Sequence, residues 1–287
     1  MTADRITIIG SGRMGQGLGR ALAGAGYAVT LVGRRERIVA SELLLHVGDW
    51  PPVTRSCDVL LLATPDDVVA GVARRLIDEN GVGSDQVVMH LSGLLDHTAL
   101  DALRPSGAAL GSFHPLKSVA ELDAATATDF AQAAVGIEGD DRAVAAAETI
   151  ARRLEMFPIR LPPGSKPAYH AAAVLVSNYT VTLVHMAERI VHEAGLRDEQ
   201  GMFQRLLEGT VANVASMTPQ EALTGPIRRG DAHTVQAHLG SLSSADRLVY
   251  RALGLEALRM AQADGLSPDA VERLLAVLTP GDGSSLS

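Results

Sequence analysis

The chain has 287 residues, of which 47% are hydrophobic and 20% are charged, and its formal net charge is −8. This length and composition suit a folded protein with two domains. The negative charge argues against nucleic acid or an anionic membrane as a partner. The single cysteine, Cys57, excludes a disulfide framework. We find no secretory signal pattern and no apolar run of membrane-spanning length, and we therefore expect a cytoplasmic protein.

A glycine-rich turn near the N-terminus is the most informative stretch. An apolar run at 6–9 predicts a buried strand, the pattern Gly10-x-Gly12-x-x-Gly15 follows it directly, and residues 14–25 suit a helix. Such glycines permit a tight turn, let a pyrophosphate approach the backbone and let the helix pack closely on the strand. The start of the helix offers free N–H groups to phosphates. A lone glycine motif is weak evidence, but the strand–turn–helix context favours a dinucleotide site at Gly10, Ser11, Gly12, Arg13, Met14 and Gly15.

The next predicted strand, at 27–32, indicates which dinucleotide this would be. NAD-binding domains usually place an Asp or Glu at this strand end to hold the ribose hydroxyls, whereas this chain has Gly33-Arg34-Arg35. Arg34, and with it Arg35, would therefore bind a 2′-phosphate, which predicts NADP as the cofactor. The alternative is that these arginines belong to a solvated loop.

Strands and helices alternate through the remainder of the first half. A helix at 36–45 is interrupted by Asp49-Trp-Pro-Pro52. Further strands are predicted at 58–63, 86–91, 108–113, 133–138 and 157–161, with helices at 67–77, 98–103 and 141–154. This order predicts an α/β fold with a Rossmann-type, mainly parallel sheet. Because ligands bind at the carboxyl ends of such strands, the candidate site residues by position are Thr64, Pro65, Ser92, Gly93 and His114.

The second half is predicted to be helical. Pro162-Pro163-Gly164 marks a boundary between an NADP-binding domain at 1–163 and a helical domain at 164–280, followed by a disordered tail at 281–287. One long helix is predicted at 167–194, and a loop is predicted at 224–230. Further helices are expected at 198–215, from 218, and at 233–239, 244–264 and 268–278. Asp231 is expected to cap one of them.

Three stretches show a resemblance to a known family. They are Gly111-Ser-Phe-His-Pro-Leu116, Lys166-Pro-Ala-Tyr-His-Ala-Ala-Ala173, and the segment from Ala222 to Asp231. The chain resembles a bacterial family that pairs a Rossmann-like domain with a helical domain of unknown function. Its first half is similar to pyrroline-5-carboxylate reductases, ketopantoate reductases and deazaflavin-dependent NADP oxidoreductases. The resemblance implies an NADP-linked oxidoreductase that holds a small molecule between the sheet edge and the helical domain, and that forms a homodimer through that domain.

Four side chains are candidates for catalysis. Ser92 and His114 would lie at the nicotinamide end of the cofactor, and His114 could donate a proton or polarise a carbonyl, although a structural histidine is an equal alternative. On a continuous helix, His170 and Asn178 would lie within roughly 80° of each other. They would then form a substrate site or a buried polar network. Some relatives carry Asn four residues after the lysine, whereas here His170 follows Lys166 at that spacing.

Other polar residues have simpler interpretations. Lys166 could donate a proton or bind a carboxylate, but a solvated surface lysine is more common. We expect Tyr169 to pack and His90 to lie in the core. The sequence predicts no metal site, because the chain has neither a His-Glu-x-x-His nor a paired Cys-x-x-Cys pattern.

The function predicted from these features is an NADPH-dependent reductase, or a dehydrogenase in reverse, acting on a small C=O or C=N substrate that could carry a carboxylate. Two alternatives stay open, a non-catalytic NADP-binding sensor and a deazaflavin:NADP oxidoreductase. The sequence does not name the substrate, the direction of the reaction or the proton donor.

Overall fold

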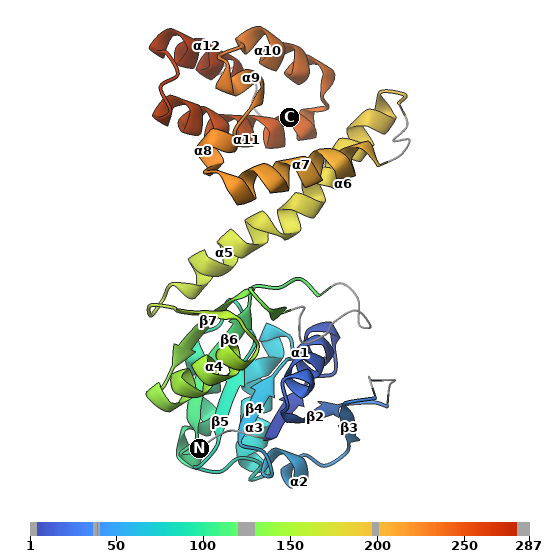
Figure 1. The fold of residues 1–287 in the computed structure, drawn as a ribbon, viewed down its shortest axis with the longest axis vertical. Coiled ribbons are helices and arrows are strands. Elements are labelled where there is room, and N and C mark those ends of the chain that lie inside the picture. The colour runs from blue at the N-terminus through green and yellow to red at the C-terminus, as the bar shows by residue number, and fades with distance from the viewer. Residues whose placement is uncertain (1–4, 37–38, 40, 120–129, 197–200, 280–287) are drawn as a thin grey trace. The chain divides into compact units, whose positions relative to one another are not determined.

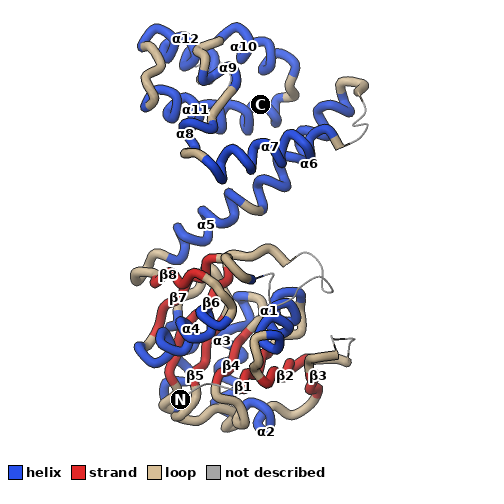
Figure 2. The backbone as a smooth tube through the Cα atoms, viewed as in Figure 1, coloured by secondary structure: helices blue, strands red, loops and turns tan. Residues whose placement is uncertain are grey.

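The computed structural model describes residues 5–36, 39, 41–119, 130–196 and 201–279. The tail predicted to be disordered lies outside these residues. The chain divides into two compact units, Met1–Thr180 and Val181–Ser287. The sequence placed a boundary at 163, whereas the contacts keep the first helix after it with the sheet. Strands occur only in the first unit among the described residues, as Figure 2 shows.

The first unit is built on an eight-stranded sheet in the order β3-β2-β1-β4-β5-β6-β7-β8. All neighbouring strands are parallel except β6 and β7. The strands are β1 (Arg5–Ile9), β2 (Ala28–Gly33), β3 (Leu44–Val47), β4 (Val59–Leu62), β5 (Val87–His90), β6 (Ala109–Pro115), β7 (Ala134–Gly139) and β8 (Phe157–Arg160). The predicted Rossmann-type, mainly parallel sheet is therefore confirmed.

Helices cover both faces of this sheet (Figure 1). The helices of this unit are α1 (Arg13–Gly24), α2 (Pro51–Thr54), α3 (Asp66–Asp78), the 3₁₀-helix η1 (His97–Ser106), α4 (Asp141–Arg153) and α5 (Lys166–Val176), of which α1, α3, η1 and α4 pack on the sheet. One apolar core joins the sheet to α1 and α4, and a second joins its other face to α3 and η1. The central strands read as continuous apolar runs because both of their faces are buried.

The second unit consists of helices in the part that the structure describes. They are most of α6 (Asn178–Glu193), then α7 (Met202–Ser216), α8 (Pro219–Ala222), α9 (Gly225–Arg228), α10 (Ala232–Ser241), α11 (Ser244–Ala263) and α12 (Pro268–Leu278). Its core is formed by Ile227, Val235, Leu239, Leu258, Leu274 and Leu278. The carboxylate of Asp231 accepts a hydrogen bond from Thr234 N, which confirms the predicted cap. None of the described helices is both long and apolar enough to span a membrane.

Four local predictions were wrong. The helix predicted at 36–45 gives way to β3, which pairs with the open edge of β2. The long helix predicted at 167–194 breaks at Ser177, where the Thr180 hydroxyl donates to the Val176 carbonyl and competes with the helical pattern. The loop predicted at 224–230 contains α9. The strand predicted to end at 113 continues to Pro115, because β7 pairs with it.

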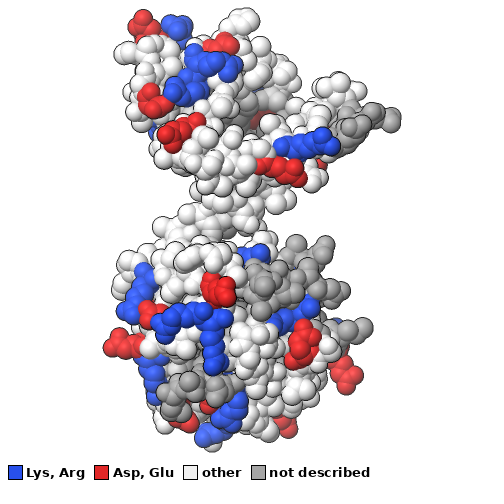
Figure 3. All heavy atoms as spheres, viewed as in Figure 1, with Lys and Arg blue, Asp and Glu red and all other residues white. Residues whose placement is uncertain are grey.

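Charged side chains of both signs are mixed over the surface. On the faces drawn in Figure 3, Lys and Arg lie among Asp and Glu, with broad uncharged areas between them. The local arrangement of cations therefore matters more for anion binding than the net charge does.

Candidate nucleotide and substrate site

The glycine turn joins β1 to α1 with almost no space to spare. Gly10 has φ +119°, and a Cβ built there would lie 2.3 Å from the Ala63 carbonyl oxygen. A Cβ on Gly15 would lie 2.0 Å from the Gly10 carbonyl oxygen, so the close helix–strand packing predicted for Gly15 is present. A Cβ on Gly12 would meet nothing within 4 Å. The backbone at Gly12 is therefore open to an approaching group, whereas Gly10 and Gly15 are required by the fold.

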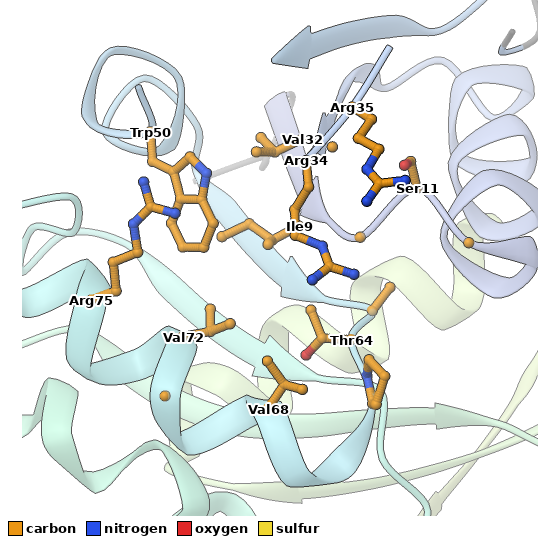
Figure 4. Close-up of a pocket in the computed structure, with 16 residues that line it drawn as sticks. Ile9, Ser11, Val32, Arg34, Arg35, Trp50, Thr64, Val68, Val72 and Arg75 are labelled. Atoms are coloured by element: carbon orange, nitrogen blue, oxygen red, sulfur yellow. The ribbon is translucent and has the colours of Figure 1, made fainter. Parts of the chain in front are cut away.

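A cavity of about 640 Å³ lies beside this turn. Seven of the predicted cofactor residues line it: Gly10, Ser11, Gly12, Arg34, Arg35, Thr64 and Pro65. The predicted residues Arg13, Met14 and Gly15 follow the turn at the start of α1 and are not among its lining residues. The remaining walls come from the ends of β1 and β2, from Trp50 and from α3, as Figure 4 shows. The turn after β1 and the end of β4 thus face one cavity.

The cavity has a positive lining. Arg34 and Arg35 form no ion pair with any described residue, whereas Arg75 pairs with Glu79 and lies 3.7 Å from the ring centroid of Trp50. No Asp or Glu is among the lining residues. In Figure 4 the guanidinium of Arg34 points toward Thr64, and that of Arg35 lies near Ser11. Guanidinium groups with no competing acid in the lining can bind a phosphate through bidentate hydrogen bonds.

Two further residues of the cavity point to a ligand. The Thr64 hydroxyl is buried and has no hydrogen-bond partner in the described part of the chain, and a buried hydroxyl normally has one. Trp50 lies in the wall, with the guanidinium of Arg75 over its ring. Sequence reasoning missed Trp50, because the only available signal was a lone tryptophan next to a helix-breaking pair of prolines.

A second cluster joins the predicted catalytic histidines. His114 lies within β6 and His170 on α5, with ring centroids 5.6 Å apart. The Tyr169 hydroxyl lies 3.1 Å from His114 Nδ1, so Tyr169 contacts this cluster as well as packing. A Cβ on Gly93 would come within 2.4 Å of His170 Nδ1 and 2.9 Å of the His114 ring. The structure therefore brings His114, His170 and the turn after β5 together.

The histidines of the cluster differ in their hydrogen bonding. Nδ1 of His170 is buried and has no partner among the described residues. Burial, together with the nearby Lys166 charge, lowers the pKa of His114 to about 4. His114 is therefore neutral at pH 7 and could donate one N–H to a ligand while its other ring nitrogen faces Tyr169.

Lys166 is buried beneath this cluster, which makes the expectation of a solvated lysine wrong. Its side chain crosses to the sheet, and its Nζ donates to the Ser92 carbonyl oxygen at 2.7 Å and to Ser112 Oγ at 2.8 Å. Burial lowers the pKa of Lys166 to about 8. An ammonium with this pKa is charged at neutral pH and can give up its proton more readily than a surface lysine.

Ser92 and Asn178 have different surroundings from those expected. The Ser92 hydroxyl accepts hydrogen bonds from the backbone N–H groups of Leu94 and Leu95, so it closes the turn after β5. Asn178 is exposed at the first position of α6. The common face proposed for His170 and Asn178 required a continuous helix, which Ser177 interrupts. His90 is fully buried in β5, as predicted.

Both clusters lie along the carboxyl edge of the parallel strands. The cavity lies at the ends of β1, β2 and β4, and the histidine cluster lies at the ends of β5 and β6. The chain leaves β1 for β2 on one side and reaches β4 on the other, so the cavity sits at the switch point where such sheets bind ligands. The described residues contain no group of three or more His, Cys, Asp or Glu that could hold a metal ion.

Comparison with protein families agrees with this architecture. A Rossmann-like domain model matches residues 2–115, and a model of a domain of unknown function (DUF2520) matches residues 133–257. The chain therefore combines a Rossmann-like domain with this helical domain, and the two matches together span most of its length. A search of curated proteins found no significant match.

Solved structures share the fold. A protein from Bacteroides fragilis, described as a candidate NADP oxidoreductase, is 19% identical with a TM-score of 0.72, over 90% of this chain and 98% of that one. A Thermotoga maritima protein is 23% identical with a TM-score of 0.70, over 90% and 99%. An imine reductase from Myxococcus stipitatus in complex with NADP⁺ is 18% identical with a TM-score of 0.62, over 94% and 99%.

Proposed function

We propose that this protein is an NADP-dependent oxidoreductase that transfers a hydride between NADPH and a small C=O or C=N substrate. The observation that carries the proposal is the cavity at the glycine turn, where Arg34 and Arg35 form no ion pair with a described residue and no acid is among the lining residues. The shared fold with a protein described as a candidate NADP oxidoreductase and with an NADP⁺-bound imine reductase supports it.

The lining residues fit the parts of this cofactor. The open backbone at Gly12 and the start of α1 would receive the pyrophosphate, and Arg34 with Arg35 would hold the 2′-phosphate. The apolar side chains of Val68 and Val72, together with Trp50, would contact the adenine. The partnerless Thr64 hydroxyl supports this assignment, because a bound cofactor would supply the hydrogen bond it lacks.

The histidine cluster would bind the substrate. When bound, NADPH supplies two electrons and one hydrogen as a hydride to the substrate carbon, and the substrate oxygen or nitrogen must take up a proton. His114 is neutral at pH 7 and could hydrogen-bond that oxygen or nitrogen, with His170 beside it. Lys166 lies in contact with Ser92 and Ser112 beneath them and holds a proton at neutral pH. We propose Lys166 as the source of that proton, and its positive charge would favour a substrate that carries a carboxylate.

Turnover and binding must be measured separately to test this function. Oxidation of NADPH would be followed at 340 nm with imines, aldehydes and keto acids as substrates, and reduced deazaflavin would be tested as a separate donor. We expect turnover with one of the carbonyl or imine substrates. His114→Ala and His170→Ala should lower kcat/KM by about tenfold or more while nucleotide binding is retained.

If NADPH binds and no substrate class supports turnover, the protein is a sensor and the catalytic part of the proposal is wrong. Turnover that requires deazaflavin would overturn the substrate assignment.

A further inference from the structure

A row of polar side chains, two of them buried and the third mostly so, crosses three strands below the histidine cluster. His90 on β5 is in register with Ser112 on β6, and Ser112 is in register with Glu138 on β7. Residues in register on neighbouring strands point to the same face of a sheet and lie close together. Lys166 Nζ contacts the middle of this row at Ser112 Oγ, 2.8 Å away. The row therefore places a carboxylate next to the hydroxyl that binds the buried ammonium.

Glu138 is an unusual acid in this position. Its side chain is only 12% exposed, and Oε2 lies 2.6 Å from Nδ1 of His97. The other oxygen, Oε1, is buried and has no hydrogen-bond partner within the described residues. A carboxylate buried in this way is costly unless a positive charge compensates it. His97 accounts for one oxygen and leaves the second to be compensated by the nearby ammonium.

The charges around Lys166 identify Glu138 as its main counter-charge. Burial lowers the pKa of Lys166, and Glu138 opposes this effect more strongly than Asp96 or Asp66. His90 and His114 also face the ammonium, and both are neutral at pH 7 because burial lowers their pKa to about 4. His170 and Tyr169 come from the helix that carries Lys166, and His97 lies beyond Glu138.

We propose that Glu138 is a positioning residue for the reduction, because its buried carboxylate keeps the proton on Lys166 beneath His114 and His170. This role rests on the proposed function. Glu138 need not touch substrate or cofactor, since it acts through Lys166. Its partner His97, at the partly exposed end of the row, holds the carboxylate in place.

The chain permits a direct test, because Lys117 and Lys166 are its only lysines. Uniform labelling with ¹⁵N-lysine would give two side-chain signals, with exposed Lys117 as an internal control, and the nucleotide-free protein can be titrated. Glu138→Gln keeps the shape and removes the charge. We expect the titration midpoint of Lys166 to fall by about one pH unit, equivalent to roughly 1.4 kcal/mol, while that of Lys117 is unchanged. Glu148→Gln, which removes an acid paired with Arg160 on the surface of the same unit, should move neither.

The same variants decide whether this charge serves the reaction. In wild-type protein, kcat/KM for NADPH-dependent reduction should fall as Lys166 loses its proton, and Glu138→Gln should move that alkaline fall to lower pH by the same amount. Glu138→Asp should give an intermediate shift in both measurements.

An unmoved Lys166 titration midpoint overturns the proposal, and so does a moved midpoint with an unmoved pH profile of kcat/KM. If Glu138→Gln does not fold, Glu138→Asp decides, since its withdrawn carboxylate should still lower the midpoint. A failure of nucleotide binding would instead overturn the proposed function and leave the titration result standing.

Discussion

At the scale of single residues, the glycines of the first turn have two separable roles. Gly15 is required for packing, because a Cβ there would lie 2.0 Å from a carbonyl oxygen, whereas a Cβ on Gly12 would meet nothing within 4 Å. Gly15→Ala should lower the free energy of unfolding by about 1–3 kcal/mol. Gly12→Ala should leave nucleotide-free stability nearly unchanged and weaken nucleotide binding by about tenfold or more, because its methyl group occupies the space the pyrophosphate needs.

Thermal unfolding and nucleotide titration of the same samples would measure this separation. Gly240→Ala is a matched control, since a Cβ at this position on α10 also meets nothing within 4 Å and lies outside the first unit. Equal loss of stability in Gly12→Ala and Gly15→Ala would contradict the assignment of Gly12 to the ligand.

Residue-level prediction succeeded where the signal was local. The tight glycine turn could be recognised because its position directly after a strand defines it, whereas the predicted role of Arg34, which lines the cavity, stays a prediction. The burial of Lys166 could not be recognised, because the atoms that receive its hydrogen bonds belong to Ser92 and Ser112, 74 and 54 residues away in the sequence. Whether a lysine near a helix start is solvated or buried depends on such distant partners, and local sequence carries no signal for them.

At the scale of elements, burial of His90 within β5 predicts an acid-sensitive sheet. Burial lowers the pKa of His90 to about 4, whereas the unfolded chain takes up this proton near pH 6.5. The unfolded state therefore binds more protons between these values, and the free energy of unfolding falls as the pH decreases from about 6.5 to 4. His90 contributes at most about 3 kcal/mol to this fall.

Urea unfolding at pH 7 and pH 4.5 would measure the effect. His90→Gln removes the titrating group, so the variant should lose less stability than wild type between the two pH values. Burial also lowers the pKa of His114, so part of the acid sensitivity should remain in this variant. An equal loss in the variant and the wild type would contradict the assignment of a neutral buried His90.

Element boundaries show where sequence patterns were insufficient. The central strands were predicted because both faces are buried and their apolar runs are continuous. β3 was missed because its Leu44–Val47 segment is short and mostly half-exposed, and its strand conformation depends on pairing with β2. The break at Ser177 was missed because the apolar pattern continues through it, so the sequence carries no signal for the end of α5 at Val176.

At the scale of the whole molecule, α6 and α7 lack the packing that stabilises ordinary helices. They have 16 and 15 residues and bury none of them within the chain. Exposed apolar side chains on these helices and the segments beside them include Val181, Leu183, Leu196, Met202, Leu206, Val211, Val214 and Met217. Helices of this length are marginal without tertiary packing.

We therefore propose that a second copy of the chain covers these helices. A surface that must be covered for the helices to be stable needs a partner that is always present, and another copy of the same chain meets this condition.

Light scattering coupled to size exclusion would test the homodimer. We expect twice the chain mass at micromolar concentration, and Val181→Glu with Leu206→Glu should produce monomers with lower thermal stability. Leu44→Glu, at an exposed apolar position on β3, is the control and should remain dimeric. A stable wild-type monomer would contradict the proposal.

We propose that the 2′-phosphate of NADP binds against Arg34 in the cavity at the glycine turn. Trp50 lines this cavity and is the only tryptophan of the chain, so its fluorescence reports binding directly. NADPH and NADH would be titrated into wild type, Arg34→Ala and the control Arg74→Ala, whose side chain bonds its own helix at Ala70. We predict at least about tenfold tighter binding of NADPH than of NADH in wild type and in the control, with the preference lost in Arg34→Ala. Equal or tighter binding of NADH by wild type, or an unchanged preference in Arg34→Ala, would contradict it.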